Sequence, residues 1–249
     1  NLTTVTLAQK GILLPAAVAW SPDSRRLFTA RLDERAVADL PLLQHVPPGG
    51  AVRPVVHHMR LALSGDPHVP LAEPCIIDVV SGAVTPVQML PEVVFVATTA
   101  ERGEVWWSAD GTRTFHLARG RAQQCLTLWE SDAASGATRA VITETSSTFI
   151  DVNLSVTGLP NIRVLDRRGE VVWFSQEDGR AHLYLHDLRT GARKNRITSG
   201  DFVVRDLADV DEETGAVLFL AGGIEPGADP ARRKLCRVQL DGSGFQVLT

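Results

Sequence analysis

Four aspartates recur along the chain at almost constant spacing, and this feature constrains the fold more than any other. They are Asp78, Asp132, Asp187 and Asp241. Each follows a short apolar run of the kind that forms a strand, and each precedes a turn that contains glycine. A strand-rich unit that repeats about every 55 residues is typical of the blades of a β-propeller. We therefore expect a platform of sheets, whose functional groups usually lie in a central channel or on loops.

A hairpin signal stands in front of each aspartate. In every repeat a strand-like run leads through a turn rich in Asp or Gly into a second run that carries an aromatic residue, as expected of antiparallel hairpins. No apolar pattern with the period of an amphipathic helix competes with it. The sequence therefore predicts an all-β fold, a partial β-propeller of about four four-stranded antiparallel blades. Their expected ranges are 16–90, 91–145, 160–200 and 202–249.

Two segments do not fit the repeat. Residues 32–74 are rich in proline and interrupt the first blade as an insertion, and insertions of this length usually carry a function or bind a partner. Alternating apolar residues over 55–63 predict an extra hairpin that leaves the blade. Residues 3–7 form a strand-like run with no repeat around it. Because a sheet edge is seldom left open, this run indicates that the chain is one part of a larger propeller.

Composition and charge exclude several partners. Of the 249 residues, 44% are hydrophobic and 22% are charged, as in ordinary globular proteins with a large core. A formal net charge of -4 gives no electrostatic reason to expect nucleic acid or an anionic membrane. No apolar run approaches the roughly 18 residues of a membrane span. We therefore expect neither nucleic acid nor a membrane as a partner.

The cysteines are few and far apart. Cys75, Cys125 and Cys236 stand in apolar, strand-like runs, so neither a disulfide framework nor a paired-cysteine metal site is indicated. We expect them to be buried thiols that pack as small apolar side chains. Free thiols are typical of a reducing compartment, and the sequence therefore predicts a cytoplasmic location.

The sequence holds no motif of a catalytic or metal site. It lacks the Gly-x-Ser-x-Gly string that places a serine nucleophile on a strained turn. His57 and His58 are neighbours on an expected strand and would point to opposite faces, so they cannot easily share one metal ion. Residues 209–215 are acidic but lack the aspartate spacing and closing glutamate of a calcium loop. We expect no catalytic residue, no metal and no cofactor in this chain.

Two pairs of neighbouring carboxylates could bind a protonated amine, such as the free N-terminus of a peptide, through charge-assisted hydrogen bonds. Asp33 and Glu34 open the long insertion and form the stronger candidate. Glu212 and Glu213 lie in an expected hairpin turn, where water would solvate them. We therefore take Asp33 and Glu34 as candidate substrate-binding residues.

An ordered set of strings resembles a known family. The strings stand at 19–23 (AWSPD), 32–37 (LDERAV), 64–67 (SGDP), 145–151 (TSSTFID), 172–185 (VWFSQEDGRAHLYL) and 198–202 (TSGDF). Taken in this order, they resemble the propeller of bacterial dipeptidyl peptidase IV-type enzymes, which are serine exopeptidases of the prolyl oligopeptidase family. Single strings of this kind occur in many propellers, whereas the ordered set spans nearly the whole chain.

The resemblance implies an eight-bladed N-terminal propeller followed by an α/β-hydrolase domain that carries the catalytic Ser, Asp and His. This chain would be the second half of such a propeller, with the hydrolase domain outside it. The paired glutamates with which the family holds the substrate's N-terminus would fall near Gln9 and Lys10, so they are not recognisable here. The segment after Phe149 approaches the active site in some relatives, which makes Asp151 and Asn153 further candidate substrate-binding residues.

The function that follows is that of a non-catalytic propeller region, which would gate and position peptide substrates for the hydrolase domain of the parent chain. That domain and the peptides are the expected partners, and a second copy of the chain is a further candidate. Two other functions stay open. A free-standing propeller would act as a scaffold for protein interactions. A propeller that binds or cleaves glycans would need pairs of acids converging on its channel.

Overall fold

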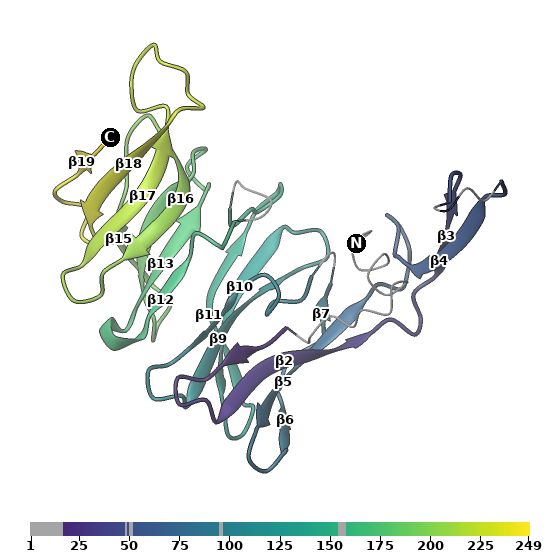
Figure 1. Ribbon diagram of the computed structural model, residues 1–249. Coiled ribbons are helices and arrows are strands. Elements are labelled where there is room, and N and C mark those ends of the chain that lie inside the picture. Colours follow the sequence, from purple (N-terminus) through teal and green to yellow (C-terminus); the bar gives the residue numbers. More distant parts are fainter. Residues whose placement is uncertain (1–16, 48, 50–51, 95–96, 154–157) are drawn as a thin grey trace.

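The computed structural model describes residues 17–47, 49, 52–94, 97–153 and 158–249 of the chain. The strand expected at 3–7 and the positions of Gln9 and Lys10 lie outside these residues. Figure 1 shows sheets that follow one another in chain order, with a separate hairpin that projects beside the first of them. Within the described ranges the regular structure is almost entirely strand, and no helix there is long and apolar enough to cross a membrane.

Most of the described strands form four sheets, and neighbouring strands in each sheet are antiparallel. The first has the order β1-β2-β5-β6 with β7 also on β5, and comprises β1 (Ala19–Trp20), β2 (Arg26–Asp33), β5 (Leu71–Asp78), β6 (Val84–Pro86) and β7 (Glu92–Val93). The second comprises β8 (Val105–Trp107), β9 (Arg113–Arg119), β10 (Cys125–Asp132) and β11 (Thr138–Thr145). The third comprises β12 (Arg163–Leu165), the 3-10 turn η1 (Asp166–Arg168), β13 (Glu170–Ser175), β14 (His182–Asp187) and β15 (Arg193–Arg196). The fourth comprises β16 (Val203–Val210), β17 (Ala216–Gly222), β18 (Arg233–Gln239) and β19 (Gln246–Val247). These sheets confirm the predicted all-β, partial-propeller fold.

The recurring aspartates mark one kind of turn, which joins the third strand of a sheet to its fourth. In the second sheet the carboxylate of Asp132 accepts hydrogen bonds from the backbone N–H and the hydroxyl of Ser135, both at 2.7 Å. The N–H of Gly136 donates to the carbonyl oxygen of Asp132 at 2.8 Å, and Gly136 has a φ of 73°. Such a side-chain bond back to the turn is the reason that Asp ends a strand. The same turn follows Asp78 and Asp187.

These turns also join consecutive sheets. A Cβ at Gly136 would overlap the carbonyl oxygen of Pro86, and a Cβ at Gly191 would overlap that of Val141. Both carbonyls belong to the last strand of the preceding sheet, so glycine lets the turn pack directly on that strand. The equivalent Gly82 of the first sheet has no atom within 4 Å of such a Cβ.

Two expectations from the sequence need correction. Asp241 lies beyond β18 and accepts a hydrogen bond from the N–H of Ser243 at 2.8 Å, so it belongs to a different turn. Cys236 is buried as expected, but Cys75 and Cys125 are only half-buried. Cys75 lies on the less covered face of β5, and Cys125 begins β10 at the margin of the core. The cytoplasmic location inferred from the cysteines stays a prediction.

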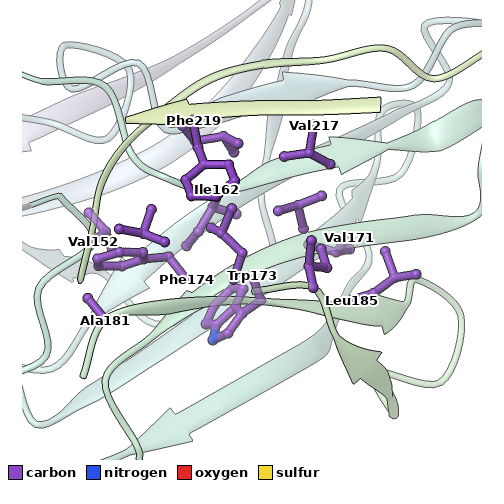
Figure 2. Close-up of a cluster of buried hydrophobic side chains, with 14 of the residues drawn as sticks. Val152, Ile162, Val171, Trp173, Phe174, Ala181, Leu185, Val217 and Phe219 are labelled. Atoms are coloured by element: carbon purple, nitrogen blue, oxygen red, sulfur yellow. The ribbon is translucent and has the colours of Figure 1, made fainter. Parts of the chain in front are cut away.

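The main core fills the space between the second, third and fourth sheets. Figure 2 shows part of it, where Trp173 and Phe174 of β13 lie in one cluster with Ile162 and with Val217 and Phe219 of β17. Each large apolar side chain buried in this way stabilises the fold by about 1.5–3 kcal/mol. A smaller cluster between the first and second sheets consists of Phe28, Ile76, Val87 and Ala133.

The insertion leaves the first sheet as a hairpin. The ladder between β2 and β5 ends at the pair Asp33–Leu71, so the segment outside the sheet, here called the excursion, is 34–70 and lies inside the expected 32–74. Within it β3 (Asp39–Gln44) pairs antiparallel with β4 (Val55–Arg60). This pairing confirms the hairpin predicted from the alternation over 55–63. In Figure 1 the hairpin stands away from the four sheets.

Candidate functional site

All four candidate substrate-binding residues lie at one end of the sheets. Because neighbouring strands are antiparallel, their connections alternate between two ends. The Asp–Gly turns occupy one end. The excursion, the turns between second and third strands, and the crossovers from sheet to sheet occupy the other, here called the loop end. Asp33 and Glu34 stand where the excursion begins, and Asp151 and Asn153 lie in the crossover between β11 and β12.

Asp33 is engaged by its own neighbour. Its carboxylate accepts hydrogen bonds from the backbone N–H and from Nε of Arg35, each at 3.0 Å, and from Nη2 at 2.7 Å. These bonds favour the charged form and hold the pKa of Asp33 well below its usual range. A substrate amine would have to compete with this guanidinium for the carboxylate.

Glu34 is the more available carboxylate of the pair. Its backbone carbonyl accepts a hydrogen bond from Nη1 of Arg60 on β4 at 2.7 Å, which fixes the start of the excursion against the hairpin. The residue is half-buried, and among the described residues its side chain makes no hydrogen bond or ion pair. Of the two predicted carboxylates, Glu34 therefore keeps its hydrogen-bonding capacity for a ligand.

The two crossover candidates differ in burial. Asp151 is half-buried and accepts a hydrogen bond from the N–H of Asn153 at 3.3 Å. Asn153 is 6% exposed, and its side-chain amide donates to the carbonyl oxygen of Leu159. This bond links Asn153 to a later residue of the same crossover. Asp151 is therefore the residue of this pair that is better placed to meet a ligand.

A group of buried charges lies between the first and second sheets, and sequence reasoning missed it. Glu104 is 2% exposed and accepts hydrogen bonds from Nε of Arg102 at 2.8 Å and from Nη1 of Arg119 at 2.6 Å. A buried carboxylate needs such partners, because an unpaired charge in the interior is strongly destabilising. The sequence signal is weak, since charged residues in a crossover and at a strand end do not reveal their pairing.

A second buried pair lies close to this group. Oε1 of Glu92 on β7 is 3.6 Å from Nε2 of His116 on β9, and Oε2 accepts a hydrogen bond from the hydroxyl of Thr99 at 2.5 Å. Nε2 of His116 also lies 3.1 Å from Sδ of Met89. Burial raises the pKa of Glu92 to about 7 and lowers that of His116 to about 3. Both groups are therefore neutral in weakly acidic solution, and both face the interior of the protein.

A cavity opens at the loop end, next to these buried groups. Its volume is about 450 Å³, and it lies between the root of the excursion, the end of β7 and the turn that joins β9 to β10. Its described lining is aliphatic except for Ser64, Gly65 and Arg121. In the described part of the chain, no group of three or more His, Cys, Asp or Glu is placed to hold a metal ion. These features suit the binding and orientation of a ligand.

Comparison with known proteins identifies a family and solved structures that share this fold. Residues 14–249 match the family model described as the dipeptidyl peptidase IV (DPP IV) N-terminal region. Dipeptidyl peptidase 4 from Porphyromonas gingivalis superposes with a TM-score of 0.70 and 18% sequence identity, over 98% of this chain and 32% of that one. A protein described as a dipeptidyl aminopeptidase IV from Bacteroides ovatus ATCC 8483 gives 0.69 and 17%, over 92% of this chain and 32% of that one. At these identities the likeness shows a shared fold, and the chain spans about a third of either structure.

Proposed function

The chain belongs to the family of dipeptidyl peptidase IV N-terminal regions, and from this membership we propose that it is the non-catalytic propeller region of a serine exopeptidase. The observation that carries the proposal is the family match over residues 14–249, which coincides with a partial propeller. The catalytic Ser, His and Asp would belong to an α/β-hydrolase domain outside these residues. The propeller would gate the entry of peptides and place them against that domain.

Positioning is the step to which this region would contribute. Holding the scissile bond next to a nucleophile converts an encounter between two molecules into an effectively unimolecular reaction. A free peptide N-terminus is cationic, and a carboxylate at the loop end would bind it through charge-assisted hydrogen bonds. Glu34 suits this role best, because Arg35 already occupies the carboxylate of Asp33. Asp151 is the next candidate.

A specific observation supports a second function, that of a scaffold for protein interactions. The hairpin β3–β4 exposes large aliphatic side chains on both of its strands: Leu43 is 51% exposed, Val55 41% and Val56 52%. Apolar side chains gathered on an exposed element commonly mark a surface that meets a partner. A second copy of the chain would be one such partner, and this function is compatible with the first.

The full-length protein that contains this chain tests the proposal. We expect it to hydrolyse peptides with a free N-terminus, and we expect kcat/KM to fall at least about tenfold when the same peptide is N-acetylated, because acetylation removes the cation. Equal rates on both peptides would contradict the binding of the amine. If the protein hydrolysed no peptide but co-purified with a stable protein partner, the scaffold function would replace the first.

A further inference from the structure

The cavity at the loop end is built from three segments that lie far apart in the sequence. The root of the excursion contributes Leu61, Leu63 and Val69, and the end of β7 contributes Val93 and Val94. The turn between β9 and β10 contributes Arg121. The cavity volume of about 450 Å³ falls within the range of small-molecule sites and is large enough for apolar side chains of a bound peptide.

Backbone hydrogen bonds fix the two walls that belong to the first sheet and its excursion. At the root of the excursion, the carboxylate of Asp66 accepts from the N–H of Leu63 at 2.8 Å, and the N–H of Asp66 donates back to the carbonyl of Leu63 at 3.1 Å. On the side of β7, the N–H of Val94 donates to the carbonyl of Pro70 at 2.9 Å. A ligand would therefore meet walls that are already formed, which lowers the entropic cost of binding.

The third wall is fixed in the same way. In the turn between β9 and β10, the N–H of Gly120 donates to the carbonyl of Cys125 at 3.0 Å, and the N–H of Gln123 donates to the carbonyl of Gly120 at 2.8 Å. The carbonyl of Gln123 in turn accepts from the N–H of Ile150 at 2.8 Å. These bonds hold the backbone on both sides of Arg121, so the position of its Cα is defined.

Arg121 supplies a cation to the lining of the cavity, and the carboxylate of Asp66 in the adjoining wall is engaged by the N–H of Leu63. Arg121 is exposed, and it makes no hydrogen bond or ion pair within the described part of the chain. No acidic residue is among the described lining residues. Behind the cavity, Arg102 and Arg119 share the single carboxylate of Glu104, and Glu92 is uncharged in weakly acidic solution. A guanidinium in such surroundings binds a carboxylate through paired, charge-assisted hydrogen bonds.

We propose that this cavity is a subsite for a peptide, which places an aliphatic side chain against Leu63 and Val94 while Arg121 binds a neighbouring carboxylate. The inference rests on the proposed function, which supplies the peptide as the class of ligand. It adds a sequence preference, for an aliphatic residue next to an acidic residue, that the amine-binding candidates do not provide.

Binding of two labelled peptides to the full-length protein tests the subsite. The peptides have one sequence and differ at a single position after a leucine, which carries Glu in one and Lys in the other. We expect fluorescence anisotropy to show about tenfold tighter binding of the Leu-Glu peptide. Arg121→Glu should reverse this preference, and Leu63→Ser should weaken the binding of both peptides alike. Leu63 is 54% exposed, so its replacement leaves the fold intact.

Arg167→Glu is the matched control. Arg167 is exposed and lies in η1, at the opposite end of the sheets, and the substitution makes the same change in net charge. The subsite is overturned if the Arg121→Glu protein still prefers the Leu-Glu peptide as the wild type does. It is also overturned if Arg167→Glu changes the preference between the two peptides as much as Arg121→Glu does. Hydrolysis of peptides that have a free N-terminus and no Leu-Glu segment reports on the proposed function alone. Discrimination between the two peptides without that hydrolysis would keep the subsite and overturn the exopeptidase assignment.

Discussion

Oε1 of Glu92 lies 3.6 Å from Nε2 of His116, and both side chains are buried where β7 of the first sheet meets β9 of the second. Burial disfavours the charged form of each group, and neither carries a charge in weakly acidic solution. The contact between the first two sheets thus contains a carboxylic acid that ionises near neutral pH. A change in pH should therefore alter the stability of this contact between the sheets, while the apolar cores stay unaffected.

Glu92→Gln should remove the contribution that Glu92 makes to the pH dependence of stability. The pKa of Glu92 is about 7 in the folded state, against the ordinary value of 4.5. His116, whose pKa is lowered from 6.5 to about 3, makes stability rise with pH between those two values. For Glu92 the unfolded chain loses its proton first, so the contribution of Glu92 to the free energy of unfolding falls as the pH rises from about 4.5 to about 7. The loss amounts to about 3 kcal/mol. Urea unfolding should therefore show a stabilisation by Glu92→Gln that is small at pH 4.5 and grows up to pH 8.

Glu213→Gln is the control for this pH effect, because Glu213 is exposed in the turn between β16 and β17. This substitution makes the same change in charge at the surface, so it separates the effect of burial at Glu92 from that of net charge. The interpretation of Glu92 is wrong if Glu92→Gln and the wild type show parallel stability curves from pH 4.5 to pH 8.

Gly191→Ala should destabilise the chain far more than Gly82→Ala does. The two glycines have nearly the same φ, 73° and 71°, so an alanine meets the same backbone strain of about 1 kcal/mol at either position. Only at Gly191 would the added Cβ also overlap a carbonyl oxygen of the preceding sheet, and overpacking raises the total cost to about 3 kcal/mol. Urea midpoints of the two variants measure the difference. Equal midpoints would show that this turn does not hold consecutive sheets together.

Glu34→Gln should raise KM for peptides with a free N-terminus about tenfold in the full-length protein, because a neutral amide loses the charge-assisted bond to the amine. Asp33→Asn should have a smaller effect, since Arg35 already engages that carboxylate. For an N-acetylated peptide the Glu34→Gln effect should vanish. An equal rise in KM for free and acetylated peptides would mean that Glu34 has a structural role. The amine would then be bound by Asp151 or by another part of the parent protein.

Local features of this fold could be predicted from the sequence, because each is encoded within a few residues. The aspartates at 78, 132 and 187 each form their turn with residues two to four positions later, so the spacing alone indicates the blades. The hairpin of the excursion follows in the same way from its alternation over 55–63. Asp241 breaks the pattern because its turn begins beyond the end of β18.

Features that depend on distant segments could not be predicted. Glu92 and His116 stand on strands of different sheets, and the cavity joins three segments that no sequence pattern links. Glu34 is free to bind a ligand and Asp33 is not, because the side chain of Arg35 folds back onto the carboxylate of Asp33. The sequence does not specify this rotamer. Such pairings follow from the packing of sheet on sheet, which a periodic pattern does not specify.

The most direct test of the central claim is to label the full-length protein with a serine-directed fluorophosphonate and to map the modified residue by mass spectrometry. We predict one labelled serine outside residues 1–249, in step with loss of hydrolysis of peptides with a free N-terminus, and no turnover by residues 1–249 alone. A labelled serine inside residues 1–249, or hydrolysis by these residues alone that the label abolishes, would contradict the account.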